Sequence, residues 1–555
     1  MTLKRIFLFF ILTPIAVLFA ASSLFGTLQE PQFQTRLELY QTNIALQAQA
    51  WQAANSQDDS SQAIREAILG DQPLESATEK YRETRQSVQT NLVKVQSQLA
   101  QLRSTDAIPT PPKPLPEVPP TIDASRSDKV KQLEQSQQKM QKFLAELDLQ
   151  LGILQAKQGK TDTALKTWSE LQQRLETESS TQNSAPAKRR ATANSTQHRL
   201  NAALPLTALS TKETAAVLIG LWSDPPRLLP DAQQQIQNNL TGWFSSTALV
   251  QLYQLQQRQA ALSEVQAAQQ DAATQAVFKL AFIGTVPALT ALVGVILLIS
   301  LTAQRLIKGK EALLAQNGDL PWTTPWDGET ILQVFVVGFF FMGQVFVPAL
   351  LLTLPIPRPV GDVRLQAVYV LISYLLVAVG ALLVMYFSIK RFFPLPRLWF
   401  KLQLRDNWFL WGLGGYCAAL PIVVIVSLIN QQLWQGQGGS NPLLQLALES
   451  QDFVALGIFY VTAAIAAPLF EEVLFRGFLL PSLTKYLPVW GSILASGLLF
   501  AIAHLSLSEV LPLTALGIVL GVVYTRSRNL LAPILLHSLW NSGTLISLFL
   551  LGSGN

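Results

Sequence analysis

"YVTAAIAAPLFEEVLFRGFLL", residues 460 to 480, is an apolar run of sequence interrupted by three charged side chains, Glu471, Glu472 and Arg476. Each ionisable group costs roughly 2.5 to 3.5 kcal/mol at the centre of a bilayer on insertion scales. Such residues are rare in membranes and usually face a partner or a cavity. The stretch therefore predicts a membrane-spanning helix that contains a polar site.

The composition of the whole chain agrees with a membrane protein. Of its 555 residues, 49% are hydrophobic and only 14% are charged. The single cysteine, Cys417, excludes an intrachain disulfide framework and a cysteine-based metal site. We expect an all-α polytopic membrane helix bundle of about eight spans, preceded by an N-terminal anchor. The expected spans are 278–302, 330–354, 365–388, 408–429, 453–480, 490–507, 511–525 and 530–551.

The N-terminus contains an apolar run at residues 6–25, which follows Lys4 and Arg5. Its length suits an uncleaved signal anchor of residues 1–26. Small residues near its end also fit a cleaved signal peptide. We favour the anchor, because the run is long enough to span a bilayer.

The connectors between the apolar runs predict the orientation. Three of them are basic, namely 305–310, 390–405 and 525–528. Placing all three in the cytoplasm obeys the positive-inside rule and leaves residues 27–275 outside. Membrane orientation thus accounts for the net charge of +5, and we expect membrane lipid rather than nucleic acid as a partner.

Residues 27–276 are predicted to form an extracytoplasmic α-helical or coiled-coil region. A proline-rich linker at 106–122 divides it, because proline cannot continue a helix. Within 140–176, the small Gly152 and the large Trp168 have the spacing of a tetratricopeptide helix pair. Such arrays need about three repeats for stability, so a plain helical scaffold is the alternative.

The polar segment 179–197 is predicted to be a loop, because it is low in aromatic residues. No catalytic constellation occurs in residues 27–276. Recruitment of a protein partner by this region is therefore a hypothesis without a motif behind it.

Histidine occurs three times in the chain, and two of these residues, His504 and His537, lie in apolar segments near the C-terminus. A single histidine in a membrane can have a purely structural role, in which it forms a hydrogen bond between two helices. Two histidines in the same hundred residues as a carboxylate pair favour a functional site, because such side chains usually line cavities.

Helical spacing sorts the charged residues of the opening stretch. Glu472 and Arg476 are four residues apart, so they share a helix face and can pair. Glu471 is rotated from Glu472 by about 100° and faces elsewhere. The stretch therefore predicts one ion pair and one spare carboxylate. By the same spacing His504 shares a face with Phe500, and His537 shares one with Asn541.

Three ordered motifs resemble the CPBP intramembrane proteases, which include the type II CAAX prenyl proteases and bacteriocin-processing proteins. They are EExxxR at 471–476, FxxxH at 500–504 and HxxxN at 537–541. The resemblance implies a protease domain at 406–551, with further membrane helices at 277–405. The long form with an outer helical region is similar to cyanobacterial and chloroplast members, which implies a bacterial plasma or thylakoid-type membrane.

The resemblance also implies roles for these residues. Glu471 would be the general base and, with His504, would polarise a water molecule. His537 and Asn541 would hold the oxyanion. Glu472 and Arg476 would form a structural ion pair. The reaction implied is endopeptidase cleavage of a membrane-associated or lipid-anchored protein or peptide.

Two questions stay open at this point. Glu471, His504 and His537 would also suit Zn²⁺, and the chain has no HExxH motif to favour that choice. A non-catalytic assembly factor or chaperone could use the same fold to bind a partner. A transporter is disfavoured, because the two membrane halves show no paired pattern of inverted repeats.

The expected spans place the two membrane histidines at different depths. His537 lies about 7 residues into its span and His504 about 14 residues into another, which corresponds to roughly 21 Å of helix. Broken or re-entrant helices around KYLPVWG and SLSEVLP would remove this conflict, because irregular backbone is tolerated where it lines a cavity.

Overall fold

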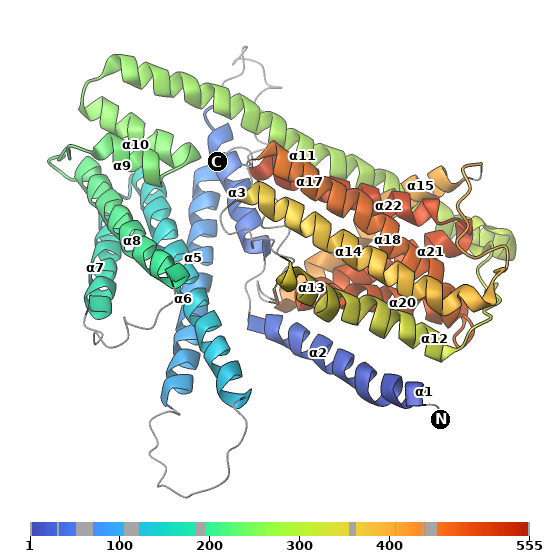
Figure 1. Cartoon of the computed structure of the whole chain (residues 1–555). Coiled ribbons are helices and arrows are strands. Elements are labelled where there is room, and N and C mark those ends of the chain that lie inside the picture. Colours follow the sequence, from blue (N-terminus) through green and yellow to red (C-terminus); the bar gives the residue numbers. More distant parts are fainter. Residues whose placement is uncertain are drawn as a thin grey trace, which may run out of the picture. The chain divides into compact units, whose positions relative to one another are not determined.

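The computed structural model of the protein describes residues 3–29, 33–51, 70, 72–104, 121–183, 195–354, 362–405, 407–434, 438–439 and 452–552. All regular elements in these ranges are helices, which confirms the all-α class (Figure 1). The helices form two compact units. The membrane unit consists of Met1–Leu37 and Ala281–Ser553, and the helical unit consists mainly of Glu38–Leu280.

The membrane unit contains the apolar helices. Eight helical segments of the described residues are long and apolar enough to cross a membrane, so the chain is an integral multi-pass membrane protein. They are α1–η1–α2 (Leu3–Phe7, Leu8–Leu12, Thr13–Gly26), α11 (Gln259–Lys308), α12–η7–α13 (Gly328–Leu332, Gln333–Phe346, Val347–Thr353), α14 (Val363–Ile389), α15 (Trp408–Trp434), α17–η9–α18–η10–α19 (Phe453–Tyr460, Val461–Ala466, Ala467–Glu472, Val473–Leu479, Leu480–Leu483), α21 (Val510–Ser527) and α22 (Leu531–Gly552).

The segment expected to span at 490–507 is shorter than predicted. It forms α20, Val489–Ile502, which has 14 residues and so extends about 21 Å at a rise of about 1.5 Å per residue. The hydrocarbon core of a bilayer is about 30 Å thick, so α20 crosses only part of it. The chain then turns at 503–506 before α21 begins, which agrees with the broken helix expected around SLSEVLP.

The close approach of α20 to α21 depends on two glycines. A Cβ atom on Gly517 would lie 2.7 Å from Gly497 Cα, a distance that real Cβ contacts do not reach. Small residues at a helix crossing let two backbones pack closely inside a membrane. This crossing holds α20, and with it the second motif, against α21.

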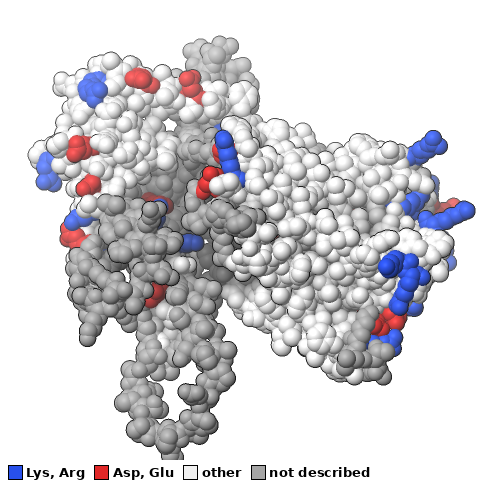
Figure 2. All heavy atoms as spheres, in the orientation of Figure 1, with Lys and Arg blue, Asp and Glu red and all other residues white. Residues whose placement is uncertain are grey.

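The surface of the membrane unit suits a bilayer. Figure 2 shows a broad face of this unit with almost no charged side chains, and Lys and Arg side chains gathered at one end. Large apolar side chains lie on the surface, for example Val379 at 55% and Ile425 at 59% exposure. Lipid solvates such side chains, whereas water would not.

The N-terminal helix packs along η7 through an apolar cluster. At its start, Arg5 Nε lies 2.6 Å from Glu329 Oε2. Just beyond its end, Thr27 Oγ1 accepts a hydrogen bond from the amide of Leu507 at 3.3 Å. Because Leu507 follows His504 by three residues, the segment after the N-terminal helix contacts the chain just beyond the second motif.

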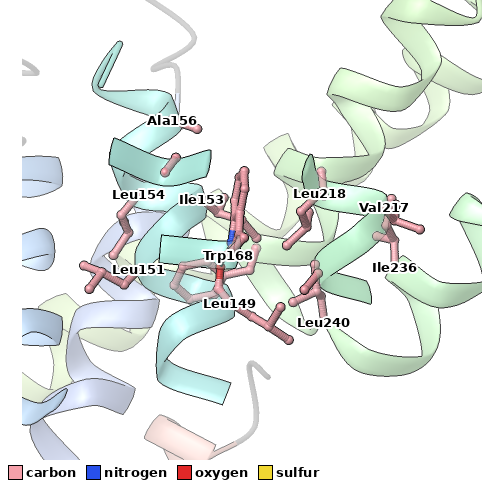
Figure 3. Close-up of a cluster of buried hydrophobic side chains, with 14 of the residues drawn as sticks. Leu149, Leu151, Ile153, Leu154, Ala156, Trp168, Val217, Leu218, Ile236 and Leu240 are labelled. Atoms are coloured by element: carbon pink, nitrogen blue, oxygen red, sulfur yellow. Dashed lines mark hydrogen bonds between the residues drawn. The ribbon is translucent and has the colours of Figure 1, made fainter. Parts of the chain in front are cut away.

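The helical unit has a core formed by packed helix pairs. Trp168 is fully buried, and its Nε1 donates to the carbonyl of Leu149 at 3.1 Å (Figure 3). A Cβ atom on Gly152 would lie 2.2 Å from Trp168 Nε1, so only glycine leaves room for the indole. The helices are α3 (Phe33–Ala48), α5 (Pro73–Ser104), α6 (Thr121–Lys157), α7 (Thr161–Asn183), α8 (Ser195–Trp222), α9 (Ala232–Asn239), α10 (Gly242–Leu255) and the start of α11.

The loop expected at 179–197 is partly helical. α7 continues to Asn183 and α8 begins at Ser195, so residues 179–183 and 195–197 of the expected loop are helical. Residues 184–194 and most of the proline-rich linker, 106–120, lie outside the described residues. The tetratricopeptide assignment and the domain boundaries stay predictions.

Candidate active site

The first motif lies on an irregular helix. The elements from α17 to α19 follow one another without a break from Phe453 to Leu483. Two stretches, Val461–Ala466 and Val473–Leu479, have π-helical hydrogen bonding, which is frequent at functional sites. The directions of the motif side chains therefore cannot be read from a 3.6-residue period alone.

Pro468 and Asn541 account for one of these stretches. The amide of Ala467 bonds to the carbonyl of Thr462, five residues back. In this register the next amide would bond to the carbonyl of Ala463, but Pro468 has no N–H. Asn541 Nδ2 supplies that hydrogen bond at 2.7 Å and thereby ties α22 to the helix of the first motif.

Glu472 lies at the centre of a buried polar cluster. Its side chain and that of Arg476 are both 0% exposed. Glu472 Oε1 accepts hydrogen bonds from Arg476 Nη1 at 2.8 Å and from His537 Nδ1 at 2.9 Å. Arg476 Nη2 also donates to the carbonyl of Gly517 at 3.2 Å, and its guanidinium lies over the Phe500 ring. These partners compensate two charges that would otherwise be costly to bury.

Glu471 adjoins this cluster through His537 and lines a cavity. Its side chain is 16% exposed, and Oε2 lies 3.9 Å from His537 Nε2. Oε1 accepts a hydrogen bond from the hydroxyl of Tyr374 at 3.1 Å. Tyr374 is on α14, outside all three motifs. Sequence reasoning missed it because a tyrosine in an apolar span is common and carries no signal of its own.

His504 lies in the turn after α20. Its Nδ1 is 2.9 Å from the carbonyl of Phe500. A carbonyl can only accept, so Nδ1 carries the proton and Nε2 of the neutral ring is an acceptor. The turn is held from outside α20, because Ser508 N donates to the carbonyl of Gly438 at 3.1 Å and Asn430 Nδ2 donates to the Ser508 carbonyl at 2.7 Å.

Two cavities meet at these side chains. One, of about 730 Å³, is lined by residues that include the four predicted catalytic residues, Glu471, His504, His537 and Asn541. A second, of about 620 Å³, is mostly apolar and shares Tyr374, Glu471 and His504 with the first. His504 follows the 14 residues of α20 and His537 lies near the start of α22, yet both line the same cavity.

In their observed side-chain conformations the three predicted zinc ligands do not form a metal site. Among the described residues, no group of three or more His, Cys, Asp or Glu side chains could hold a metal ion. His537 directs Nδ1 to Glu472, and its Nε2 lies 3.9 Å from Glu471 Oε2. Zinc binding by Glu471, His504 and His537 therefore stays a prediction.

The fold and the site together define a multi-pass membrane protein with a carboxylate–histidine site inside its helices. Residues 453–543 match the family described as "Type II CAAX prenyl endopeptidase Rce1-like". All three motifs lie inside this match. The comparison confirms the resemblance to CAAX-type membrane proteases for this part of the chain.

Two curated relatives support the same assignment. "Putative membrane peptidase YdiL" of Bacillus subtilis (strain 168) is 28% identical over 137 residues, covering 25% of this chain and 55% of the relative. "Membrane-embedded CAAX protease MroQ" of Staphylococcus aureus (strain USA300) is 27% identical over 142 residues, covering 24% and 56%. The chain thus spans about half the length of the curated relatives that it matches. No solved structure matches it.

Proposed function

We propose that this chain is an intramembrane endopeptidase that hydrolyses a peptide bond in a membrane-associated or lipid-anchored protein or peptide. One observation carries the proposal. Glu472 is fully buried and paired with Arg476, whereas the adjacent Glu471 reaches a cavity that it shares with His504. A carboxylate held in a membrane is costly, and activation of water gives it a use.

Glu471 and His504 are both acceptors toward the cavity. The δ nitrogen of His504 is occupied by the Phe500 carbonyl, so its ε nitrogen can accept one hydrogen of a water molecule while Glu471 accepts the other. Glu471 then takes the proton as the water oxygen attacks the scissile carbonyl. When the C–N bond breaks, the same proton passes to the leaving amine.

His537 and Asn541 are the proposed oxyanion donors, and the structure limits how each can act. Because Nδ1 of His537 donates to Glu472, Nε2 donates only when the ring carries both protons. Asn541 uses one amide hydrogen on Ala463, so the second is the one available to an oxyanion.

Terminal-peptide proteomics tests the proposal. Membranes with the wild-type chain are compared with membranes carrying Glu471→Gln or His504→Ala. The matched control is Glu509→Gln, which changes another carboxylate that lines the same cavity. We expect a set of peptide termini that disappears in both site variants and persists in the control, at equal protein levels. Identical termini in all four samples, with a phenotype rescued by the site variants, would instead support a non-catalytic assembly factor.

Orientation and the outer region are part of the same proposal. We place the basic connectors in the cytoplasm, the N-terminal helix as a retained anchor, and residues 27–275 outside. Accessibility of single cysteines to a membrane-impermeant thiol reagent tests this placement, with Cys417 replaced by Ala first. Deleting residues 27–275 tests whether the outer region selects substrates or recruits a partner, since an unchanged set of termini would remove that role.

A further inference from the structure

The geometry points to Tyr374 as a positioning residue that orients Glu471 for water activation. This inference rests on the proposed peptidase function. It adds a residue from α14, which lies outside the family match at 453–543.

Tyr374 contacts the proposed base directly. Its hydroxyl donates to Glu471 Oε1 at 3.1 Å. Its ring packs edge-to-face on Phe470, with centroids 6.1 Å apart, which fixes the direction of the phenol. Tyr374, Glu471 and His504 line both cavities, so the hydrogen bond lies at the wall that the two cavities share.

The phenol distinguishes the two oxygens of the carboxylate. Oε1 is occupied by the Tyr374 hydroxyl, while Oε2 lies 3.9 Å from His537 Nε2. The last torsion of a glutamate side chain is broad and roughly two-fold, so without this donor the carboxylate can turn toward His537. With the donor in place, Oε2 is the oxygen left to take a proton from water. A catalytic group is effective only when held to within about 10 to 20° of its productive direction.

A role in packing alone is the competing explanation, and one substitution separates the two. Tyr374→Phe keeps the ring against Phe470 and removes only the donor. Tyr369→Phe is the matched control, because this tyrosine lies five residues earlier on α14 and lines the apolar cavity but not the shared wall.

The experiment uses the full chain in proteoliposomes and an internally quenched peptide that spans a terminus lost in Glu471→Gln. We expect Tyr374→Phe to lower kcat by about 10- to 100-fold, the effect of losing a hydrogen bond to a charged group. KM should stay within about two-fold, because the residue acts through Glu471 and not on the substrate. Tyr369→Phe should leave both constants within about two-fold of the wild type.

Several outcomes would overturn the inference. If Glu471→Gln is inactive while Tyr374→Phe keeps wild-type kcat, the positioning role is wrong and the peptidase proposal stands. A raised KM with unchanged kcat would make Tyr374 a substrate contact. If no terminus depends on Glu471, the proposed function itself fails. Should Tyr374→Phe not fold, Tyr374→His, which carries a donor, is compared with Tyr374→Leu, which has none, and equal losses would contradict the inference.

Discussion

His537 Nδ1 and Glu472 Oε1 are joined by a hydrogen bond of 2.9 Å. Both side chains are almost completely buried. This contact connects the third motif on α22 to the first motif on α18. The spacing of the motif predicted only that Glu472 neutralises Arg476. In the structure Glu472 has a second role. It also fixes the ring of His537 and the nitrogen that faces Glu471.

Removing the charge of Glu472 should destabilise the membrane unit. Glu472→Gln leaves the buried Arg476 without its counter-charge, and we expect the free energy of unfolding to fall by about 3 to 5 kcal/mol. Unfolding in mixed micelles by titration with a denaturing detergent measures this. Glu471→Gln is the control and should cost less than about 1.5 kcal/mol, because it weakens one hydrogen bond at a partly exposed site. Equal losses in the two variants would contradict the assigned division of roles.

Asn541 and Pro468 should be energetically coupled. Asn541→Ala leaves the Ala463 carbonyl without its partner, and we expect a loss of about 1 to 3 kcal/mol. Pro468→Ala restores an N–H in the register that reaches this carbonyl. The double variant should therefore lose less than Asn541→Ala alone, by about 1 kcal/mol. Additive losses in a double-mutant cycle would show that the proline does not release the carbonyl.

The glycine crossing of α20 and α21 should not tolerate a methyl group. Gly517→Ala would bring a Cβ within 2.7 Å of Gly497 Cα and force the helices apart, with an expected loss of about 1 to 3 kcal/mol. The proposed peptidase activity should fall as well, because His504 lies in the turn that follows α20. Gly457→Ala is the control, since its Cβ would meet nothing within 4 Å. Wild-type stability and activity in Gly517→Ala would refute the role of this crossing.

The membrane unit should lose one source of stability in acid. Asp452 caps α17 and lies 2.6 Å from Arg364 on α14. Hydrogen bonds from the Ala455 amide and from Arg364 hold the pKa of Asp452 below its usual 3.8. A carboxyl whose pKa is lowered on folding adds stability above its unfolded pKa, and this is lost as the pH falls through the lower folded value.

Asp452→Asn measures this contribution. At pH 7 the wild type should melt at a higher temperature than the variant, because only the wild type has the charged cap and ion pair. The difference should shrink below about pH 4, where the carboxyl of the wild type becomes protonated. A difference that stays constant from pH 7 to about pH 2 would mean that the carboxylate charge is not what stabilises this helix start.

Metal removal should leave the proposed activity unchanged. The mechanism proposed above activates water with Glu471 and His504 alone, so it predicts cleavage that does not depend on a metal ion. Cleavage of the quenched peptide is measured before and after dialysis against a strong chelator, in metal-free buffer. Loss of cleavage that returns with added Zn²⁺, but not with Mg²⁺, would show that the side chains rearrange around a metal.

Much of the fold could be predicted from the sequence, because membrane helices follow local rules. The spans expected at 453–480 and 530–551 end within three residues of the observed helices. The pair of Glu472 with Arg476 was predictable for the same reason, since an i to i+4 contact needs only one helical turn. The length of α20 could not be predicted in this way, because apolar residues continue past the point where the backbone turns.

The amino-acid sequence by itself determined the apolar runs, the three motifs and the contacts within one helix turn. Only the tertiary structure decided which motif residues meet. The bonds of His537 to Glu472, Asn541 to Ala463 and Tyr374 to Glu471 join residues 65, 78 and 97 positions apart. Such contacts depend on helix packing, on a proline that frees a carbonyl and on glycines that let backbones approach. No periodicity along one helix contains that information.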